Sequence, residues 1–406
     1  MHIMKLTDLP DEFIKATPII EKIEQAGFEA YFVGGSVRDI ILNQKIHDVD
    51  IATSAFPEEI QQIFPKTIDV GIEHGTVLVL FQDEQYEITT FRTESTYQDY
   101  RRPDEVTFVR SLEEDLKRRD FTMNALAMGK NGEIIDLFNG IEAINNKQIV
   151  AVGNPSERFH EDALRMMRGL RFSSQLNFEI EEKTKEAIKE HHALLGKISV
   201  ERIYIEFIKL LTANYRNQGL IAMIETRCFE YCPGLQTKEK ELKALTLISN
   251  QSIFETEELA WLILMYIINI DNPKSFLKKW KSSNKLMSHI EACLNELRHR
   301  ENHEWDILRL YESGPEVISD VEKARLLLGL DSNEESSLQQ YNELPIKSIR
   351  DLAITGKDVL QALDQKPGPW LGKLLKQIEE SVVLGKIPNT KEVLIQAALT
   401  IKEENE

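Results

Sequence analysis

The chain has 406 residues, of which 42% are hydrophobic and 29% are charged, and its formal net charge is −18. This length and composition are ordinary for a soluble globular protein of two to four domains and exclude a largely disordered chain. The acidity excludes a generic nucleic-acid binder, because phosphate contacts need lysine and arginine. Any polyanionic partner must therefore meet local basic patches.

The first residues and the cysteines predict the compartment. Residues 1–5 lead into no apolar segment with a cleavage site, and the longest apolar run, residues 259–270, is too short to span a bilayer and predicts a buried helix. The three cysteines form no even disulfide framework and no C-x₂-C pair. We expect a cytoplasmic protein with no membrane contact, and zinc is not expected.

Up to about residue 150 the sequence alternates strand-like and helix-like segments, which predicts an α/β or α+β domain. The predicted strands are short, rich in β-branched and aromatic residues and bounded by Gly, Asp and Pro. They are Phe28–Val33, Val49–Thr53, Thr76–Phe81 and Tyr86–Phe91.

The segment Gly34–Asp39 and the nearby Asp48 and Asp50 predict a nucleotidyl-transfer site. Two glycines after an apolar run let the backbone approach a triphosphate, and Ser36 can open a helix whose N–H groups point at phosphate. On a strand, residues i and i+2 point to one side, so Asp48 and Asp50 would face the same place. Such oxygen ligands suit Mg²⁺, which in pairs activates an attacking hydroxyl and steadies the leaving pyrophosphate.

The segment from Phe91 to Leu116 is predicted to be a loop. Its centre, Tyr97 to Glu105, is charged and aromatic but offers little core. A long loop beside an active site often works as a lid, which we favour over a surface insertion without function.

After residue 155 the pattern becomes helical almost to the end of the chain. Gly and Pro punctuation divides this region into several helical pieces. The breaks are Cys232-Pro233-Gly234, Asn272-Pro273, Ser313-Gly314-Pro315 and Lys366-Pro367-Gly368-Pro369.

Residues 158–172 are predicted to form one helix on which Asp162 and Arg165 are neighbours. Geometry alone favours an ion pair between them, with Arg168 and Arg171 solvated. An Asp-Arg pair could also read a base, because cytosine and adenine present an amine donor beside a ring-nitrogen acceptor. Guanine and uracil reverse this pattern, and each unpaired group in a dry site costs about 1–3 kcal/mol.

Four motifs together resemble the class II, bacterial-type CCA-adding tRNA nucleotidyltransferases of the DNA polymerase β-like superfamily. They are Gly34–Asp39 with Asp48–Asp50, Arg118–Ala125, Asp136–Gly140 and Glu161–Arg165, and the similarity extends over the whole chain. The resemblance implies an α+β fold, with a catalytic head containing a mixed sheet followed by an all-helical neck, body and tail. The implied boundaries are residues 1–150, 151–215, 216–312 and 313–406.

The resemblance also implies the activity, which is template-independent addition of C, C and A to tRNA 3′ ends from CTP and ATP, with Mg²⁺ as cofactor and release of pyrophosphate. Such an enzyme serves tRNA processing and repair, binds the tRNA 3′ end at the head and holds the tRNA elbow with its tail. A monomer and a homodimer both remain open.

Carried over by motif, the resemblance assigns Asp48 and Asp50 as metal ligands. It assigns Gly35 and Arg38 as contacts of the triphosphate, and Asp162 and Arg165 as the pair that reads the base. Arg119, Arg168 and Arg171 would contact the nucleotide, and Asp120 would face the ribose. A third metal carboxylate is expected on a neighbouring strand, for which Glu87 is the candidate, a solubilising edge charge being the alternative.

Two alternative functions remain open at this point. One is a relative with partial activity, which adds only A, adds only CC or makes poly(A). The other is a tRNA-binding protein without catalysis, which the presence of both Asp48 and Asp50 disfavours. The change from C to A addition requires movement, and residues 91–116 and 136–140 are the segments we expect to move.

Overall fold

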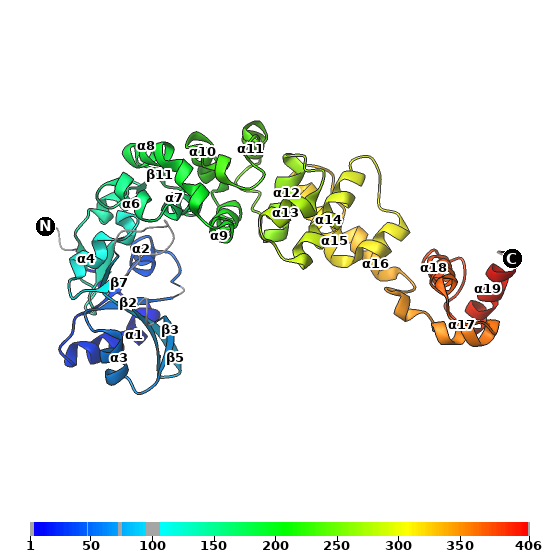
Figure 1. Cartoon of the computed structure of the whole chain (residues 1–406), viewed down its shortest axis with the longest axis horizontal. Helices are drawn as coiled ribbons and strands as arrows, with labels where there is room; N and C mark the ends of the chain where they lie inside the picture. Colours follow the sequence, from blue (N-terminus) through cyan, green and yellow to red (C-terminus); the bar gives the residue numbers. More distant parts are fainter. Residues whose placement is uncertain (1–3, 47, 72–74, 95–105, 405–406) are drawn as a thin grey trace. The chain divides into compact units, whose positions relative to one another are not determined.

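The computed structural model describes residues 4–46, 48–71, 75–94 and 106–404. The chain divides into two compact units, residues 1–253 and 254–406, and each is described by itself. Helices dominate both units and a mixed sheet lies in the first, which confirms the predicted α+β class (Figure 1). Among the described residues, no helix is long and apolar enough to cross a membrane.

Seven strands of the described chain form one sheet in the order β3-β4-β5-β2-β1-β8-β9. Strands β2 and β5 pair in parallel and the other neighbours pair antiparallel, so the sheet is mixed. The strands are β1 (Ala30–Val33), β2 (Asp50–Thr53), β3 (Thr67–Gly71), β4 (Thr76–Phe81), β5 (Glu84–Thr90), β8 (Leu126–Met128) and β9 (Ile134–Asp136).

The helices of the first unit cover the sheet and then continue beyond it. They are α1 (Asp11–Gln25), α2 (Gly35–Ile41), α3 (Pro57–Ile63), α4 (Leu112–Lys117), α5 (Gly140–Asn145), α6 (Pro155–Glu161), α7 (Leu164–Leu176), α8 (Glu182–His191), α9 (Val200–Leu211), α10 (Arg216–Glu225) and α11 (Glu239–Leu245). One short exception interrupts the predicted all-helical region, because β11 (Glu179–Ile180) pairs in parallel with β10 (Gln148–Ile149).

The two faces of the sheet carry different side chains. Phe32 of β1 packs edge-on against Phe13 of α1, with ring centroids 4.9 Å apart, and its register partner Ile51 shares that face. Because side chains alternate along a strand, Val33 and its partner Asp50 lie on the opposite face. Asp50 therefore lies on the face that α1 leaves uncovered.

The segment between Phe91 and Leu116 was predicted to be a loop throughout, but two strands and a helix form at its ends. Strands β6 (Arg92–Glu94) and β7 (Val106–Phe108) pair antiparallel, and α4 follows after Ser111, whose hydroxyl caps the helix. A three-residue strand gives too short a pattern to recognise in a polar sequence. Residues 95–105, which hold most of the proposed lid with Tyr97 to Glu105, lie outside the described residues.

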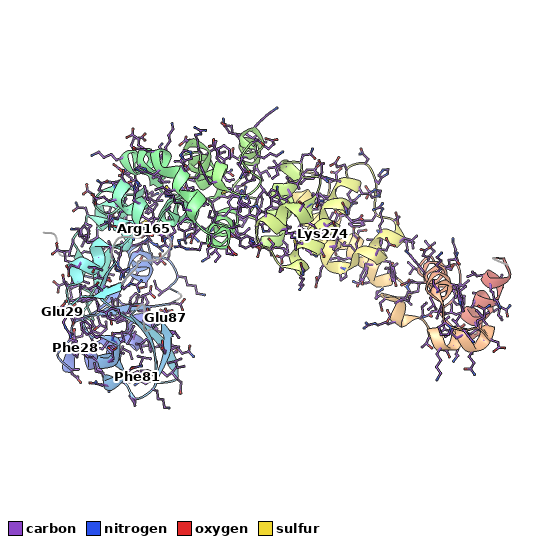
Figure 2. The ribbon with its side chains drawn as sticks, in the orientation of Figure 1. Phe28, Glu29, Phe81, Glu87, Arg165 and Lys274 are labelled. Carbon is purple, nitrogen blue, oxygen red and sulfur yellow. The ribbon has the colours of Figure 1, made fainter. Side chains whose placement is uncertain are left out.

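The second unit is helical wherever the structure describes it. Its helices are α12 (Glu257–Ile267), α13 (Pro273–Lys279), α14 (Asn284–His299), α15 (Ile307–Leu327), α16 (Glu334–Glu343), α17 (Gly356–Leu363), α18 (Pro369–Val383) and α19 (Lys391–Glu404). Residues 259–265 of α12 are at most 2% exposed, which confirms a buried helix. Lys274 of α13, labelled in Figure 2, pairs with Glu291 of α14.

The predicted breaks coincide with helix boundaries or with a kink. Asn272 caps α13 through the Ser275 N–H at 2.8 Å, and Pro369 is the first residue of α18. Gly314 interrupts α15 with a φ of 72°, a left-handed conformation that glycine adopts without a steric penalty.

Candidate active site

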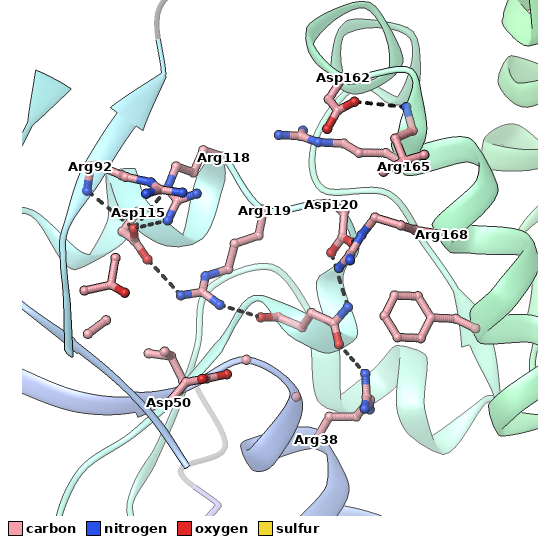
Figure 3. Close-up of a pocket in the computed structure, with 18 of the residues that line it drawn as sticks. Arg38, Asp50, Arg92, Asp115, Arg118, Arg119, Asp120, Asp162, Arg165 and Arg168 are labelled. Atoms are coloured by element: carbon pink, nitrogen blue, oxygen red, sulfur yellow. Dashed lines mark hydrogen bonds and ion pairs between the residues drawn. The ribbon is translucent and has the colours of Figure 1, made fainter. Parts of the chain in front are cut away.

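A cavity of about 720 Å³ lies beside strands β1, β2 and β5 and helices α4, α7 and α9 of the first unit (Figure 3). Among the described residues, eight arginines and four aspartates line it. This local excess of positive charge contrasts with the net charge of −18 of the whole chain. A volume of this size suits a small-molecule ligand, and the arginines favour one with several negative charges.

The glycine turn brings the backbone close to the cavity. Gly34 has a φ of 72°, and a Cβ placed there would lie 3.1 Å from an Nη of Arg119 and 3.8 Å from an Oδ of Asp50. A side chain would therefore be strained and would crowd the Arg119 guanidinium. Helix α2 begins at Gly35, one residue earlier than predicted, and the Ser36 hydroxyl donates to the Val33 carbonyl instead of capping the helix.

The structure brings the three predicted catalytic carboxylates to one region of the sheet. Strand β2 begins at Asp50, and the register of Ile51 with Ile88 places Glu87 of β5 beside Asp50. Asp48, Asp50 and Glu87 all line a second cavity of about 380 Å³, and Asp50 lines both cavities.

The electrostatics of Asp50 suit a cation site. The surrounding protein displaces water from its carboxylate and so raises its pKa; Arg119 opposes this shift, whereas Glu87 and Asp48 add to it. Three carboxylates that repel one another, with oxygen donors only, fit a hard divalent cation such as Mg²⁺.

Asp115 is a cavity residue that the sequence analysis missed. Its side chain is 1% exposed; one carboxylate oxygen accepts hydrogen bonds from Arg118 at 2.8 and 3.0 Å, and the other accepts from Arg119 at 3.0 Å. Burial alone would raise the pKa of Asp115, but the two arginines lower it. Asp115 precedes Arg118 by three residues and Arg119 by four, and this spacing is the sequence signal that could have identified the two ion pairs.

A chain of hydrogen bonds crosses the cavity wall from α2 to α7 (Figure 3). Arg38 donates to the Asn124 side-chain carbonyl at 2.7 Å, and the Asn124 amide donates to Asp120 at 3.2 Å. Arg168 donates to the other oxygen of Asp120 at 2.7 Å. Burial would raise the pKa of Asp120, but Arg168 above all lowers it to about 2. Asp120 is therefore ionised at neutral pH.

The predicted continuous helix through Asp162 is wrong, and so is the predicted pair with Arg165. Helix α6 ends at Glu161, and Asp162 is extended because one carboxylate oxygen accepts the Leu164 N–H at 3.0 Å. Its other oxygen accepts from Arg202 of α9 at 2.7 Å, whereas Arg165 pairs with Glu161 at 2.9 Å. Both Asp162 and Arg165 still line the cavity.

Helix α9 supplies a second carboxylate that the sequence analysis missed. Glu206 pairs with Arg171 at 2.6 Å. Arg171 is therefore held in an ion pair, and the expectation that it would be solvated is wrong. The Phe172 ring lies under Arg171 at 4.0 Å and Arg168 at 5.4 Å, measured from the guanidinium carbon to the ring centroid. Arg202 and Glu206 are four residues apart on α9, but sequence alone does not say which helix that face meets.

The sequence-predicted residues thus gather around two adjoining cavities. Lining the larger one are Gly35, Arg38, Asp50, Arg119, Asp120, Asp162, Arg165, Arg168 and Arg171, and Asp48 and Glu87 line the smaller one. Carboxylates beside an arginine-lined cavity suit transfer of a nucleotide from its triphosphate.

Comparison with known proteins agrees with this chemistry. Residues 30–150 match the family described as "Poly A polymerase head domain". Residues 177–238 match "Probable RNA and SrmB- binding site of polymerase A", and residues 253–398 match "tRNA nucleotidyltransferase domain 2 putative". By fold and site the protein is a nucleotidyltransferase.

Full-length relatives define the family more narrowly. The chain is 57% identical to the CCA-adding enzyme of Enterococcus faecalis, over 97% of this chain and 98% of that one. It is 50% identical to the CCA-adding enzyme of Ligilactobacillus salivarius, over 99% and 100% of the two chains. The crystal structure of the Bacillus stearothermophilus CCA-adding enzyme in complex with CTP matches with a TM-score of 0.91 and 41% identity, over 98% and 99%. The chain belongs to the CCA-adding enzyme family.

Proposed function

We propose that this protein adds C, C and A in turn to the 3′ end of tRNA, using CTP and ATP and releasing pyrophosphate. The observation that carries the proposal is the cavity, in which arginines from α2, α7 and α9 and from the segment that follows α4 lie around a sheet that bears Asp50. The family relationship and the match to a CTP-bound relative support the same function.

The triphosphate would lie between the glycine turn and the arginines. Arg119 lies beside Gly34 and Arg38 beside Gly35, both line the cavity, and Asp115 holds Arg119 in place. Their charges would stabilise the leaving pyrophosphate as the tRNA 3′-hydroxyl attacks the α-phosphate in line.

Mg²⁺ is the proposed cofactor, because the candidate ligands offer oxygen only. Asp48 and Asp50 would hold it, with Glu87 as the third carboxylate. When bound, Mg²⁺ lowers the pKa of an attacking hydroxyl and neutralises charge on the phosphates.

The base would be selected by Asp162 and Arg165 rather than by a template. Arg202 holds the Asp162 carboxylate and Glu161 holds the Arg165 guanidinium, so each recognition group has a partner that fixes its direction. A carboxylate that accepts from the amine and a guanidinium that donates to the ring nitrogen would admit cytosine and adenine. Arg168 and Arg171 would complete the nucleotide contacts, and Asp120 would face the ribose.

The tail, residues 313–406, would hold the tRNA elbow, which the match of residues 253–398 to a tRNA nucleotidyltransferase domain supports. The boundaries at residues 150, 215 and 312 stay predictions. We also place the protein in the cytoplasm, since its three cysteines are buried and free, as a reducing compartment would keep them.

The test is an addition assay on tRNA that lacks its CCA end, with CTP and ATP separately and together. Full CCA addition is expected with Mg²⁺; incorporation of A alone, of C alone or of a poly(A) tract would identify a partial-activity relative. No incorporation at all would leave only tRNA binding.

Variants separate chemistry from base selection. Asp48→Asn should abolish all additions alike, whereas Asp162→Asn should reduce the preference for CTP over UTP by about 5- to 150-fold, which corresponds to roughly 1–3 kcal/mol. Glu87→Gln should lose activity, while Glu179→Gln, an exposed strand carboxylate that lines neither cavity, is the matched control. The reverse pattern for Asp48 and Asp162 would contradict this division of roles.

A further inference from the structure

Three side chains of types that bind transition metals meet between α14 and α15 in the second unit. His289 and Cys293 lie one turn apart on α14 and so share a face, and Asp320 comes from α15. The His289 Nε2 atom is 2.7 Å from an Asp320 carboxylate oxygen and 3.4 Å from the Cys293 Sγ. All three ligand atoms lie within 4.8 Å of one another, the one such group among the described residues.

The spacing is close to that of a tetrahedral metal site. With metal–nitrogen and metal–oxygen bonds of about 2.0–2.2 Å and a metal–sulfur bond of about 2.3 Å, neighbouring ligand atoms lie roughly 3.3–3.8 Å apart. The separation of His289 and Cys293 already falls in this range. His289 and Asp320 are hydrogen-bonded and need to separate by less than 1 Å or so, which side-chain rotation can supply.

The surroundings favour a cation at this position. Burial raises the pKa of the Cys293 thiol, and the charges of Asp320 and of Glu258 on α12 raise it further. The hydrogen bond to Asp320 and the charge of Glu258 raise the pKa of His289. Carboxylates on α12 and α15 thus make the site electronegative, and the partly exposed His289 and Asp320 leave a path from solvent.

We propose that His289, Cys293 and Asp320 bind a thiophilic divalent cation such as Zn²⁺, with water as the fourth ligand. Binding releases the thiol proton of Cys293, and the fraction of His289 that is imidazolium also loses a proton, so the cation replaces between one and two protons. The thiolate selects Zn²⁺ over Mg²⁺, which separates this site from the carboxylates of the sheet. The cation would tie α14 to α15 within the second unit.

The first experiment uses Co²⁺ as a spectroscopic probe on the metal-free full-length protein. A Co²⁺–thiolate bond gives a near-ultraviolet charge-transfer band that carboxylate-bound Co²⁺ lacks. We expect this band in the wild type, its loss on adding Zn²⁺ and its absence in Cys293→Ser. Cys228→Ser, which alters a buried cysteine of the first unit, is the matched control and should keep the band.

A second measurement does not depend on the thiol. Zn²⁺ at saturating concentration should raise the unfolding temperature of the second unit by about 5 °C or more, and Asp320→Asn should remove this shift. Calorimetry in buffers of different ionisation enthalpy should count at least one proton released per Zn²⁺, the thiol proton of Cys293. Absence of both the Co²⁺ band and the Zn²⁺ shift in the wild type would overturn the proposal, as would a band that persists in Cys293→Ser.

Discussion

Asp115 fixes the direction of two cavity arginines, Arg118 and Arg119, although its own side chain is almost fully buried. Both of its oxygens accept from guanidinium groups, and Arg118 and Arg119 both follow the last residue of α4. Removing the charge of Asp115 would free both side chains to rotate away from the proposed triphosphate position.

We therefore expect Asp115→Asn to raise the KM for CTP and for ATP alike by about tenfold, or about 1.4 kcal/mol, because the proposed role of the arginines is to hold the triphosphate that both nucleotides share. Steady-state addition assays with each nucleotide measure this effect. Glu113→Gln, an exposed change on the same helix, should leave KM unaltered. A change in base preference without a change in KM would show that Asp115 has a different role.

The low pKa of Asp120 makes a prediction about stability and pH. Because its folded pKa is about 2 and its ordinary value is 3.8, the ionised carboxylate stabilises the folded state. The contribution, about 2 kcal/mol, is fully present above the unfolded pKa and is lost as pH falls through the folded pKa. Asp120→Asn should therefore destabilise the first unit at pH 7, and its deficit should shrink between pH 4 and pH 2.

Urea unfolding followed by circular dichroism across this pH range would measure the Asp120 effect. A deficit that stays constant with pH would mean that the substitution acts through packing, since an amide can still accept from Arg168 but carries no charge. Glu59→Gln, which removes the charge of a partly exposed ion pair with Arg110, is the control, and its effect on the unfolding free energy should be small at every pH.

At the scale of elements, Glu322 joins three segments of the second unit. This carboxylate of α15 is 0% exposed and accepts from Arg300 at 3.0 Å, from the Trp305 indole at 2.7 Å and from the Asn333 N–H at 2.7 Å. It therefore links α14, the connection to α15 and the start of α16. Arg300 also pairs with Glu304, whose side chain is 80% exposed.

The two carboxylate partners of Arg300 should contribute very different amounts to the unfolding free energy. Glu322→Gln leaves a buried guanidinium without its compensating charge and should cost about 3–5 kcal/mol of unfolding free energy. Glu304→Gln should cost at most about 1 kcal/mol, because its charge stays in water. Urea unfolding followed by tryptophan fluorescence tests both, and equal losses would contradict the argument.

Patterns local to one element were predictable from the sequence. Strands β1, β2, β4 and β5 carry apolar β-branched residues, and the proline breaks mark helix ends at Asn272 and Pro369. Strand β3 was missed because Ile68 and Val70 are exposed and its sequence shows no buried face. The break at Asp162 was missed because a single side-chain hydrogen bond to the first residue of α7, not composition, marks it.

The candidate site was predictable where charged residues stand in motifs, as for Asp50 and Arg165. The residues that orient them were not. Arg202 and Glu206 act on α7 from α9, and Asp320 meets His289 only because α14 packs against α15. Such pairs depend on the angle between helices, which a single sequence does not encode in any local pattern.

At the scale of the whole molecule, the four tryptophans are distributed unevenly. All of them lie beyond residue 260, so each belongs to the second unit, whereas every residue that lines the larger cavity lies in the first. Tryptophan fluorescence therefore follows the unfolding of the second unit alone. Calorimetry follows both units, so the two methods together can assign each transition.

This distribution predicts which transition a nucleotide will move. The proposed nucleotide site lies within the first unit, so CTP at about 100 times its dissociation constant should stabilise that unit by about 2.7 kcal/mol. Calorimetry should show one transition rising by several degrees while the transition seen by tryptophan fluorescence stays in place. Zn²⁺ should move the tryptophan transition and leave the other unchanged. If CTP shifted both transitions equally, the two units would unfold as one cooperative body, and the nucleotide site would be energetically coupled to the helices proposed to hold the tRNA elbow.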